Sequence, residues 1–595
     1  MAEIIEDITP EISKGVEFLR HYLGKEGQNL LKDVVPKNGE IASFEFQLPE
    51  DYLGISRSLC IGFHKGFPIT GLHLQVKPSA WLEWPHVMRK SICLYGFGEK
   101  PSGISPELVV YDALQRFRKL LQLVLPDSDE YERNREFTNE ISPYWQMQLT
   151  RNKQQLILLE HPTESCELFV LTDQRQISNK NRTVWLAKNT GGLESHLTRL
   201  FNRREKVSAP AEAGFFVRLK SFPNVEIPSQ EQIFSWLSGH ISSEDETLLS
   251  EWNLKSTFYP IRWLLLEIPG ANPPNIQAIV LRHKGVKYDS YHIYGRRAAR
   301  RGEITKVLEP LASLEYCSVH LLSKSTIHSR DTLLVNEELT NKKVAIIGTG
   351  SLGSSVVMQL VRAGISNLTL IDPDKFESAN IGRHVLGIDD LGQNKTDALK
   401  ERIQKDIPFV NIKSIPRFIQ YELIDQIKLL DDMDVIVITS ADWLSEELIW
   451  FLRDLKEKKW ALIQGWTEPY AIVGHIVVVP YNNSSDGRYL FDHNGNFKHR
   501  FTDWPDNGVI ALPGCGHGFI PGGPIGVNSI ANSIAQTTID VLIGEITEPV
   551  WISNIGDIEK IVQAKGKYIG PSIPAGCKQM VISQAWPQME KNDET

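Results

Sequence analysis

The feature that most constrains the fold is a glycine-rich turn in the stretch KKVAIIGTGSLGSSVVMQLVRAG, residues 342–364. Gly348, Gly350 and Gly353 have the spacing G-x-G-x-x-G directly after an apolar run. Glycines at these positions let the backbone approach a phosphate, which then lies at the positive N-terminal end of the following helix. The alternative is a tight turn that only packs a strand against a helix. Because the motif follows a strand pattern and begins a helical one, we expect a bound nucleotide.

The segments around this turn predict the fold of residues 333–595. The short β-branched runs KVAIIG, LTLID, VIVITS and WALIQGW alternate with helical patterns, which indicates a doubly wound α/β domain with a buried parallel sheet. Asp372 ends the run LTLID, 22 residues after Gly350, where an acid binds a ribose hydroxyl in such folds. NAD and ATP fit this pattern equally well.

A set of charged residues beyond Asp372 favours ATP. Arg383 lies in NIGR with Asn380, Lys395 lies in GQNK, and Asp442 follows the run VIVITS. An adenylating enzyme needs cations to neutralise departing pyrophosphate and a carboxylate to hold Mg²⁺. A hydride transferase has little use for them. We therefore expect ATP and Mg²⁺, with a NAD-dependent oxidoreductase or a non-catalytic nucleotide-sensing scaffold as alternatives.

The order of these motifs over about residues 333–560 resembles the ThiF/MoeB/ubiquitin-activating superfamily, which activates the C-terminal carboxylate of a small protein as an acyl-adenylate. The turn reads G-T-G-S-L-G instead of G-x-G-G-x-G, and the late acid stands in S-A-D-W instead of T-D-N. The resemblance implies a homodimer. It also implies nucleotide binding by Gly348, Gly350, Gly353, Asp372, Asp374 and Asn380, triphosphate contacts by Arg383 and Lys395, and Mg²⁺ binding by Asp442.

The remainder of the chain is expected to form two further domains, residues 1–145 and 146–332. The first has a helical segment, strand-like runs, a loop and an amphipathic helix, which indicates a small α+β domain. The second mixes strand and short helical patterns and is expected to be a mixed α/β domain without a readable motif. The apolar stripe expected on the amphipathic helix of the first domain comprises Leu108, Tyr111, Leu114, Phe117, Leu121 and Val124.

Two cysteines are candidate nucleophiles near the C-terminus. Cys515 lies in the glycine-rich segment LPGCGHGFIPGG, which is accessible and poorly suited to a core. In the superfamily this loop can carry the cysteine that receives the activated carboxylate as a thioester, so the resemblance implies that role for Cys515. Cys577, in SIPAGCKQM, is the competing candidate.

The N-terminal domain resembles the ubiquitin-conjugating fold. Its FP before a strand, its segment WPHVMRKSICL and its ISP before a helix occur in that family's order. The resemblance implies that Cys93 carries a thioester and that His86 stands near the family's oxyanion-stabilising asparagine. W-P-H replaces H-P-N, and His86 precedes Cys93 by seven residues where the family usually has eight. The alternative is a buried strand cysteine beside a core histidine.

An activating and a conjugating module on one chain resemble the fused activating–conjugating family of bacterial CBASS antiphage operons. That family attaches the C-terminus of a cyclic-oligonucleotide synthase (CD-NTase) to target proteins. The resemblance implies four steps: an acyl-adenylate, a thioester on Cys515, a thioester on Cys93, and an isopeptide bond to a target lysine. Two thiols in series are chemically sensible, because a thioester keeps the activation energy and still yields to an amine.

Composition excludes some other classes of partner. The formal charge of -9, with 42% hydrophobic and 23% charged residues, is ordinary for a globular protein and gives no general signal for nucleic acid binding. No apolar run approaches the roughly 20 residues of a membrane span. The acidic N-terminus lacks the pattern of a signal peptide. We therefore expect a cytoplasmic protein that binds neither membrane nor nucleic acid.

Overall fold

A computed structural model describes residues 9–24, 31–37, 39–96, 99, 105–172, 183–201, 212–257, 259–271, 273–283, 286–289, 305–308, 311–330, 337–455, 460–481, 483, 485–511 and 518–587. The chain divides into two compact units. The N-terminal unit comprises Met1–Ile157, Pro162–Lys188 and Ala209–His320, and the C-terminal unit comprises Leu158–His161, Asn189–Ser208 and Leu321–Thr595. The predicted domain boundaries after residues 145 and 332 stay predictions.

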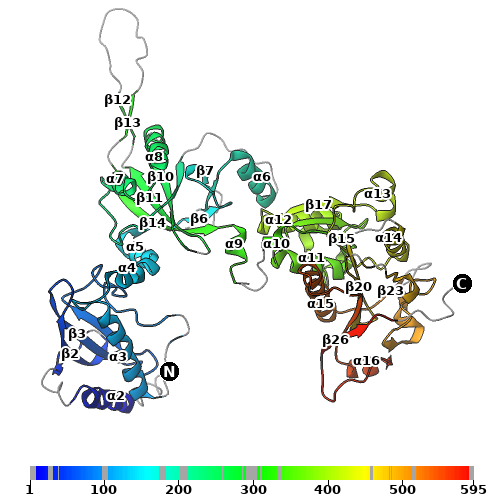
Figure 1. Cartoon of the computed structure of the whole chain (residues 1–595), viewed down its shortest axis with the longest axis horizontal. Helices are drawn as coiled ribbons and strands as arrows, with labels where there is room; N and C mark the ends of the chain where they lie inside the picture. Colours follow the sequence, from blue (N-terminus) through cyan, green and yellow to red (C-terminus); the bar gives the residue numbers. More distant parts are fainter. Residues whose placement is uncertain are drawn as a thin grey trace, which may run out of the picture. The chain divides into compact units, whose positions relative to one another are not determined.

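The first part of the N-terminal unit is a four-stranded antiparallel sheet beside two helices (Figure 1). Its elements are α2 (Thr9–Tyr22), β1 (Leu31–Asp33), β2 (Glu40–Glu50), β3 (Ser56–His64), β4 (His73–Lys77) and α3 (Pro106–Gln122), with the strands paired in chain order. Helix α3 begins with Pro106 after the N-cap Ser105, whose side chain accepts the backbone N–H of Leu108. This order of helix, meander, loop and helix agrees with the predicted α+β domain.

The buried face of α3 agrees with the predicted stripe at Leu114 and Phe117 but differs from it in the first turns. There Val109, Val110 and Ala113 are buried, whereas Leu108 is 51% and Tyr111 42% exposed. The run LVVY places apolar residues on both sides of the expected stripe, so the helical period predicts the helix but not which of these neighbours is buried. Tyr111 instead meets the ring of Tyr22 from α2 edge-on, with centroids 5.6 Å apart.

The second part of the N-terminal unit is built on an eight-stranded sheet in the order β11-β10-β9-β7-β8-β6-β14-β5, in which β11 also pairs with β14. Helix α5 packs on it with α7 and α8 through a core that includes Trp145, Phe215 and Trp252. The elements of this part are α4 (Glu130–Asn139), α5 (Ile141–Gln148), β5 (Thr150–Arg151), β6 (Gln155–Leu158), β7 (Cys166–Thr172), β8 (Thr183–Ala187), β9 (Ala213–Arg218), α7 (Ile233–Ser238), α8 (Ser243–Lys255), β10 (Ile261–Ile268), β11 (Asn275–His283), the ribbon β12 (Val286–Asp289) and β13 (Thr305–Leu308), and β14 (Leu311–Leu321).

The C-terminal unit is built on an eight-stranded sheet in the order β17-β16-β15-β18-β19-β20-β24-β26. The first five strands are parallel, as predicted, and the last three extend the sheet in antiparallel fashion. These strands are β15 (Lys343–Ile347), β16 (Asn367–Ile371), β17 (Asn411–Ile415), β18 (Val435–Ile438), β19 (Ala461–Thr467), β20 (Val473–Val479), β24 (Val550–Ile555) and β26 (Met580–Ala585).

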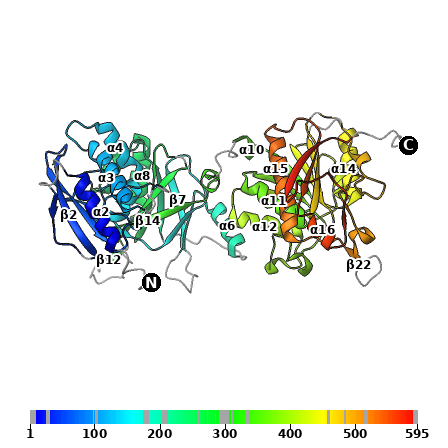
Figure 2. The ribbon, with the colours of Figure 1, turned by 90° about the horizontal axis from the view of Figure 1, so that it is seen from below.

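Helices cover both faces of this sheet. On one face, α11 (Ser351–Arg362), α12 (Lys395–Asp406) and α15 (Pro524–Leu542) pack against Val344 and Ile346. Helices α11 and α15 lie side by side there (Figures 1 and 2). On the other face, α13 (Ile419–Asp425) and α14 (Trp443–Leu455) pack against Ala345 and Ile347. The alternation of side chains along β15 therefore supplies both cores.

Shorter elements complete the C-terminal unit. They are α6 (Thr190–Phe201), which packs on α12, and α9 (Lys324–Ile327), α10 (Glu337–Asn341), η1 (Ser378–Asn380), η2 (Ile388–Asp390), η3 (Arg488–Leu490), β21 (Thr502–Asp503), η4 (Pro505–Gly508), β22 (Ile510–Ala511), β23 (Gly518–Phe519), α16 (Glu559–Gln563) and β25 (Lys567–Tyr568).

The strand order indicates where a ligand would bind in this unit. The order reverses between β15, which precedes the glycine turn, and β18, which precedes Asp442. Ligands of open α/β sheets bind at the carboxyl ends of the strands at such a reversal. Among the helices that the structure describes, none combines the length and the apolar character needed to cross a membrane.

Candidate active site

The three glycines of the turn meet different structural demands. Gly348 has a φ of +90°, and a Cβ there would lie 2.5 Å from the Cα of Ser440. A Cβ on Gly353 would overlap the carbonyl oxygen of Gly348. At Gly350, by contrast, a Cβ would meet none of the described atoms within 4 Å. The first and third glycines are thus required by packing, whereas the second leaves open space at the N-terminus of α11, where an anion is favoured.

Asp372 ties the glycine turn to the loop after β16. Its Oδ2 accepts the backbone N–H of Thr349 at 2.6 Å, and its Oδ1 accepts that of Asp374 at 2.9 Å. The side chain is buried, and this burial raises the pKa of Asp372, against the opposing effect of these hydrogen bonds and of Lys395. Asp372 therefore orders the turn, and its contact with a ribose stays a prediction.

The D-x-D and G-Q-x-K motifs meet directly. Lys395 Nζ lies 2.7 Å from Asp374 Oδ2, and the backbone N–H of Lys395 donates to the carbonyl of Asp374 at 3.0 Å. The Lys395 side chain is 10% exposed and that of Asp374 63%. A mostly buried ammonium held by one exposed carboxylate can exchange that partner for the oxygen of a ligand.

Arg383 and Asn380 lie in the segment after this loop. Asn380 uses its Oδ1 to accept the backbone N–H of Glu377 at 3.0 Å, which closes η1. The Nε of Arg383 is buried and has no hydrogen-bond partner among the described residues, and the same holds for the hydroxyls of Thr349 and Thr396. Unsatisfied buried donors cost free energy. An anionic ligand of Arg383 would remove that cost.

Asp442 follows β18 and lines the same cavity as Gly348 of the glycine turn. Its Oδ2 accepts hydrogen bonds from the hydroxyl of Ser445 and, at 3.4 Å, from Gln420 Nε2. A small cavity of about 150 Å³ is lined by Ile347, Gly348, Ile371, Asp372, Pro373, Asp374, Arg417, Phe418, Ile419, Ser440, Asp442 and Ser445. Four predicted residues thus line one cavity, which Lys395 reaches through Asp374. Gly350, Gly353, Asn380 and Arg383 are not part of its lining.

Glu446 is a buried carboxyl that sequence reasoning missed. Its Oε1 accepts the hydroxyl of Ser440 at 3.0 Å, its Oε2 accepts Gln464 Nε2 at 2.8 Å, and the backbone N–H groups of Ala441 and Asp442 also donate to it. Burial raises the pKa of Glu446 to about 7. Since Ala441 has a φ of +53°, this carboxyl stabilises a strained turn that presents Asp442.

His384 is a second missed residue, and it follows N-x-x-R directly in the sequence. Its Nε2 donates to the carbonyl of Thr349 at 2.8 Å, while its Nδ1 accepts the N–H of Leu386 at 3.1 Å. One nitrogen donates and the other accepts, as in a neutral imidazole, and burial lowers the pKa of His384. A neutral histidine thus connects the NIGR segment to the glycine turn.

Cys93 lies in an exposed loop of the N-terminal unit. Its backbone N–H donates to the carbonyl of His86 at 2.7 Å, and Val87 pairs with Ile92 between them. The interpretation of Cys93 as a buried strand cysteine is therefore wrong. Desolvation around the sulfur, followed by the charge of Glu140, raises the pKa of the Cys93 thiol, against a hydrogen bond from the Tyr95 backbone.

His86 lies between two carboxylates. Its Nδ1 is 2.9 Å from Glu140 Oε1 and its Nε2 is 3.2 Å from Glu136 Oε2. The hydrogen bond to Glu140 is the main cause that raises the pKa of His86. Carboxylates only accept, so both ring nitrogens carry protons and the ring is an imidazolium. Sequence reasoning missed both acids, because they lie 50 or more residues further along the chain and belong to no motif.

The cysteines near the C-terminus stay undecided. Cys515 lies outside the residues that the structure describes. Cys577 is half-buried, and its sulfur lies 3.2 Å from the carbonyl of Gln579. The role predicted for Cys515 remains a prediction, and Cys577 remains its competitor.

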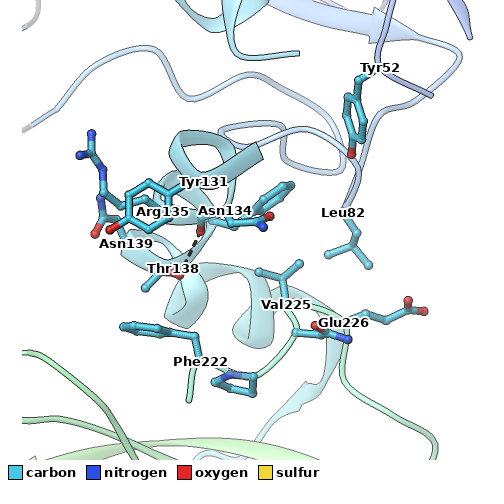
Figure 3. Close-up of a pocket in the computed structure, with 13 residues that line it drawn as sticks. Tyr52, Leu82, Tyr131, Asn134, Arg135, Thr138, Asn139, Phe222, Val225 and Glu226 are labelled. Atoms are coloured by element: carbon cyan, nitrogen blue, oxygen red, sulfur yellow. Dashed lines mark hydrogen bonds between the residues drawn. The ribbon is translucent and has the colours of Figure 1, made fainter. Parts of the chain in front are cut away.

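A separate hollow of about 670 Å³ lies within the N-terminal unit (Figure 3). One side is α4, where the hydroxyl of Thr138 donates to the carbonyl of Asn134 at 3.0 Å, and the other side includes Phe222 and Val225. Its lining contains none of the predicted site residues.

Comparison with known proteins supports the assignment of the C-terminal unit. Residues 326–516 match the family model of the ThiF family. This segment is therefore a ThiF-type domain, and the α/β fold class predicted for it is confirmed.

Two similar proteins agree with the ThiF assignment. The chain is similar to the ATP-dependent ubiquitin transferase-like protein Cap2 of Enterobacter hormaechei subsp. hoffmannii, with 28% identity over 202 residues, 31% of this chain and 34% of the relative. Cap2 of Pseudomonas aeruginosa is 33% identical over 101 residues, 16% of this chain and 19% of the relative. The chain thus spans between a fifth and about a third of the length of these relatives. These partial matches show a similarity to Cap2 proteins and agree with the ThiF match of residues 326–516.

A solved structure gives a weaker match. The crystal structure of PaaA is 23% identical with a TM-score of 0.29, covering 39% of this chain and 66% of that chain.

Proposed function

We propose that this chain ligates proteins in an ATP-dependent reaction: it adenylates the C-terminal carboxylate of a partner protein and transfers the acyl group to target amines. One observation carries the proposal. In a ThiF-type domain, the glycine turn, Asp372, the Asp374–Lys395 pair and Asp442 meet at the reversal of strand order. The ThiF match and the names of the Cap2 relatives support an adenylating enzyme.

In the first step, a carboxylate oxygen of the partner attacks the α-phosphorus of the substrate ATP, and pyrophosphate leaves. The glycine turn and the N-terminus of α11 would bind phosphate oxygens. Arg383 and Lys395 would neutralise the charge of the leaving group, and the unpaired Nε of Arg383 fits that role. Asp442 would hold Mg²⁺, which supplies further positive charge to the phosphates.

In the following steps the acyl group moves along two thiols. The sulfur of Cys515 attacks the acyl carbon, AMP leaves and the thiol proton is lost to solvent. The sulfur of Cys93 then replaces that of Cys515, which regains a proton. Finally a lysine amine attacks, an amide bond forms, and Cys93 leaves as a thiol.

The remaining assignments belong to the same proposal. The modifier is a CD-NTase, the acceptors are proteins with accessible lysines, and the chain acts as a homodimer. The resemblance of the motifs to the CBASS family supports these partners, and the names of the Cap2 relatives support a protein as the substrate.

Two assays test the proposal. ATP–pyrophosphate exchange should require ATP, Mg²⁺ and the intact C-terminus of the modifier. On a non-reducing gel, thiol-sensitive adducts should form; C515A should remove all of them, and C93A should remove the second adduct and the ligated product. C577A is the matched control and should change neither.

Three outcomes would contradict the proposal or part of it. An adduct that survives C93A and C515A together excludes the relay. Loss of the first adduct in C577A alone moves the first thioester to Cys577. NADH binding without any exchange activity favours the oxidoreductase alternative.

A further inference from the structure

One end of the four-stranded sheet gathers three metal-binding side chains on a single face. Glu40 begins β2, His64 ends β3 and His73 begins β4. The register pairs Glu40 with His64 and Gly62 with His73. Because Gly62 and His64 are two residues apart on β3, all these positions share one face. The ligand atoms of the three side chains lie within 4.8 Å of one another.

Gly62 makes this arrangement possible. A Cβ on Gly62 would overlap the carboxylate of Glu40, which instead lies across β3 with its Oε1 2.9 Å from His73 Nδ1. The other oxygen of Glu40 accepts the hydroxyl of Ser43 at 2.6 Å and the backbone N–H of Lys37 at 3.0 Å. The carboxylate is 6% exposed. It is therefore held in place from several sides.

The hydrogen bonds of the two histidines fix which nitrogen is available. His64 Nδ1 lies 2.9 Å from the carbonyl of Gly39, and His73 Nε2 lies 2.9 Å from the carbonyl of Lys90. A carbonyl only accepts, so each of these nitrogens carries a proton. Metal-binding histidines commonly use the second nitrogen in this way. The remaining nitrogens are His64 Nε2 and His73 Nδ1.

The contact between His73 and Glu40 requires a positive charge. Nδ1 of a histidine already protonated on Nε2 has a lone pair, and a carboxylate oxygen also only accepts. At 2.9 Å the two lone pairs repel each other unless a positive charge lies close to both atoms, and a bound cation would supply it. A cation there would also be within reach of His64.

From this geometry we propose that Glu40, His64 and His73 form a Zn²⁺ site. Two imidazole nitrogens and one carboxylate oxygen are a ligand set that zinc takes, with water in the fourth position. Because the Lys90 carbonyl belongs to the loop between His86 and Cys93, the metal would fasten that loop to the sheet. The site stands independently of the proposed ligation activity.

Equilibrium dialysis of the full chain against ZnCl₂, after treatment with a chelator, tests the site. The wild type should bind one more equivalent of zinc than H64Q or H73Q, and E40Q should weaken binding by about 100-fold or more, beyond the 10–100-fold typical of losing an outer partner. H21Q, on the exposed end of α2 in the same unit, is the matched control and should bind as the wild type does. Zinc held by other residues, such as the cysteines, cancels in the difference.

Two further readouts separate metal binding from folding. Substituted Co²⁺ should give the visible bands of a tetrahedral site in the wild type and in H21Q, and these bands should disappear in H64Q. The melting temperature should rise with zinc in the wild type and stay constant in H64Q, a change at the end of a strand. Equal zinc stoichiometry and equal Co²⁺ spectra in wild type, H64Q and H73Q would overturn the proposal.

Discussion

The nucleotide site of the C-terminal unit and the thiol site of the N-terminal unit are built in different ways. The first is fixed largely by backbone: glycines that fit where no Cβ fits, and turns at the ends of parallel strands. The second depends on side chains from distant segments, since Glu136 and Glu140 pair with His86 across 50 or more residues. Backbone requirements can be recognised in a sequence, because they demand particular residue types in a fixed order. A pair of side chains from distant segments leaves no such pattern.

The sites also resemble each other in one respect. Each contains a candidate cation that is already paired with an acid: Lys395 with Asp374, and His86 with two glutamates. Under the proposed function these pairs compete with the substrate for the same charge.

The largest effect is expected from removing the charge of Lys395. K395M should lower the rate of ATP–pyrophosphate exchange about 10²–10³-fold, because one preorganised cation is lost from the developing charge of pyrophosphate. K375M, which changes an exposed lysine next to Asp374, is the matched control and should remain within about 3-fold of the wild type. Equal rates in the two variants would make the Asp374–Lys395 pair purely structural.

The second prediction compares two glycines of one turn. G353A should lower the free energy of unfolding by about 3 kcal/mol, the upper part of the range for overpacking, because its Cβ overlaps the Gly348 carbonyl. G350A should change stability by less than about 1 kcal/mol, since its Cβ meets open space, but should weaken ATP binding. Urea denaturation and ATP titration measure the two effects. If G350A binds ATP as the wild type does, the phosphates do not approach this glycine.

The same contrast explains how much the sequence could predict. The buried parallel sheet and the glycine turn follow from patterns with a mechanical reason, whereas the strand order and the direct pairing of Asp374 with Lys395 are seen only in the structure. The buried side chains in the first turns of α3 could not be predicted either, because LVVY is apolar on both sides of the expected stripe. Glu446 and Gln464, 18 residues apart, meet only once the sheet and α14 are packed together. The antiparallel strands after β19 likewise carry no motif that announces their direction.

A third prediction concerns the buried carboxyl beneath Asp442. Burial raises the pKa of Glu446 from its ordinary 4.5 to about 7 in the folded state. The free energy of unfolding is therefore highest below pH 4.5 and decreases as the pH rises through 7. The decline amounts to about 3 kcal/mol. E446Q should remove this slope, whereas E447Q on the exposed side of α14 should retain it. Denaturant melts between pH 5 and 8 measure the slopes, and parallel slopes in wild type and E446Q would contradict the prediction.

The smallest effect is expected at the thiol site. The acids around His86 raise its pKa above the ordinary 6.5, so its contribution is fully present below pH 6.5 and disappears as the pH rises through the folded-state pKa. H86Q should therefore cost about 1 kcal/mol of stability at pH 6 and less at pH 9. If His86 acts only through this pairing, E136Q and E140Q should change the pH dependence of stability in the same direction as H86Q does. The same two variants should leave aminolysis of a preformed Cys93 thioester unchanged. Slower aminolysis in H86Q, with unchanged aminolysis in E136Q and E140Q, would instead assign the ring a role at the reacting carbonyl.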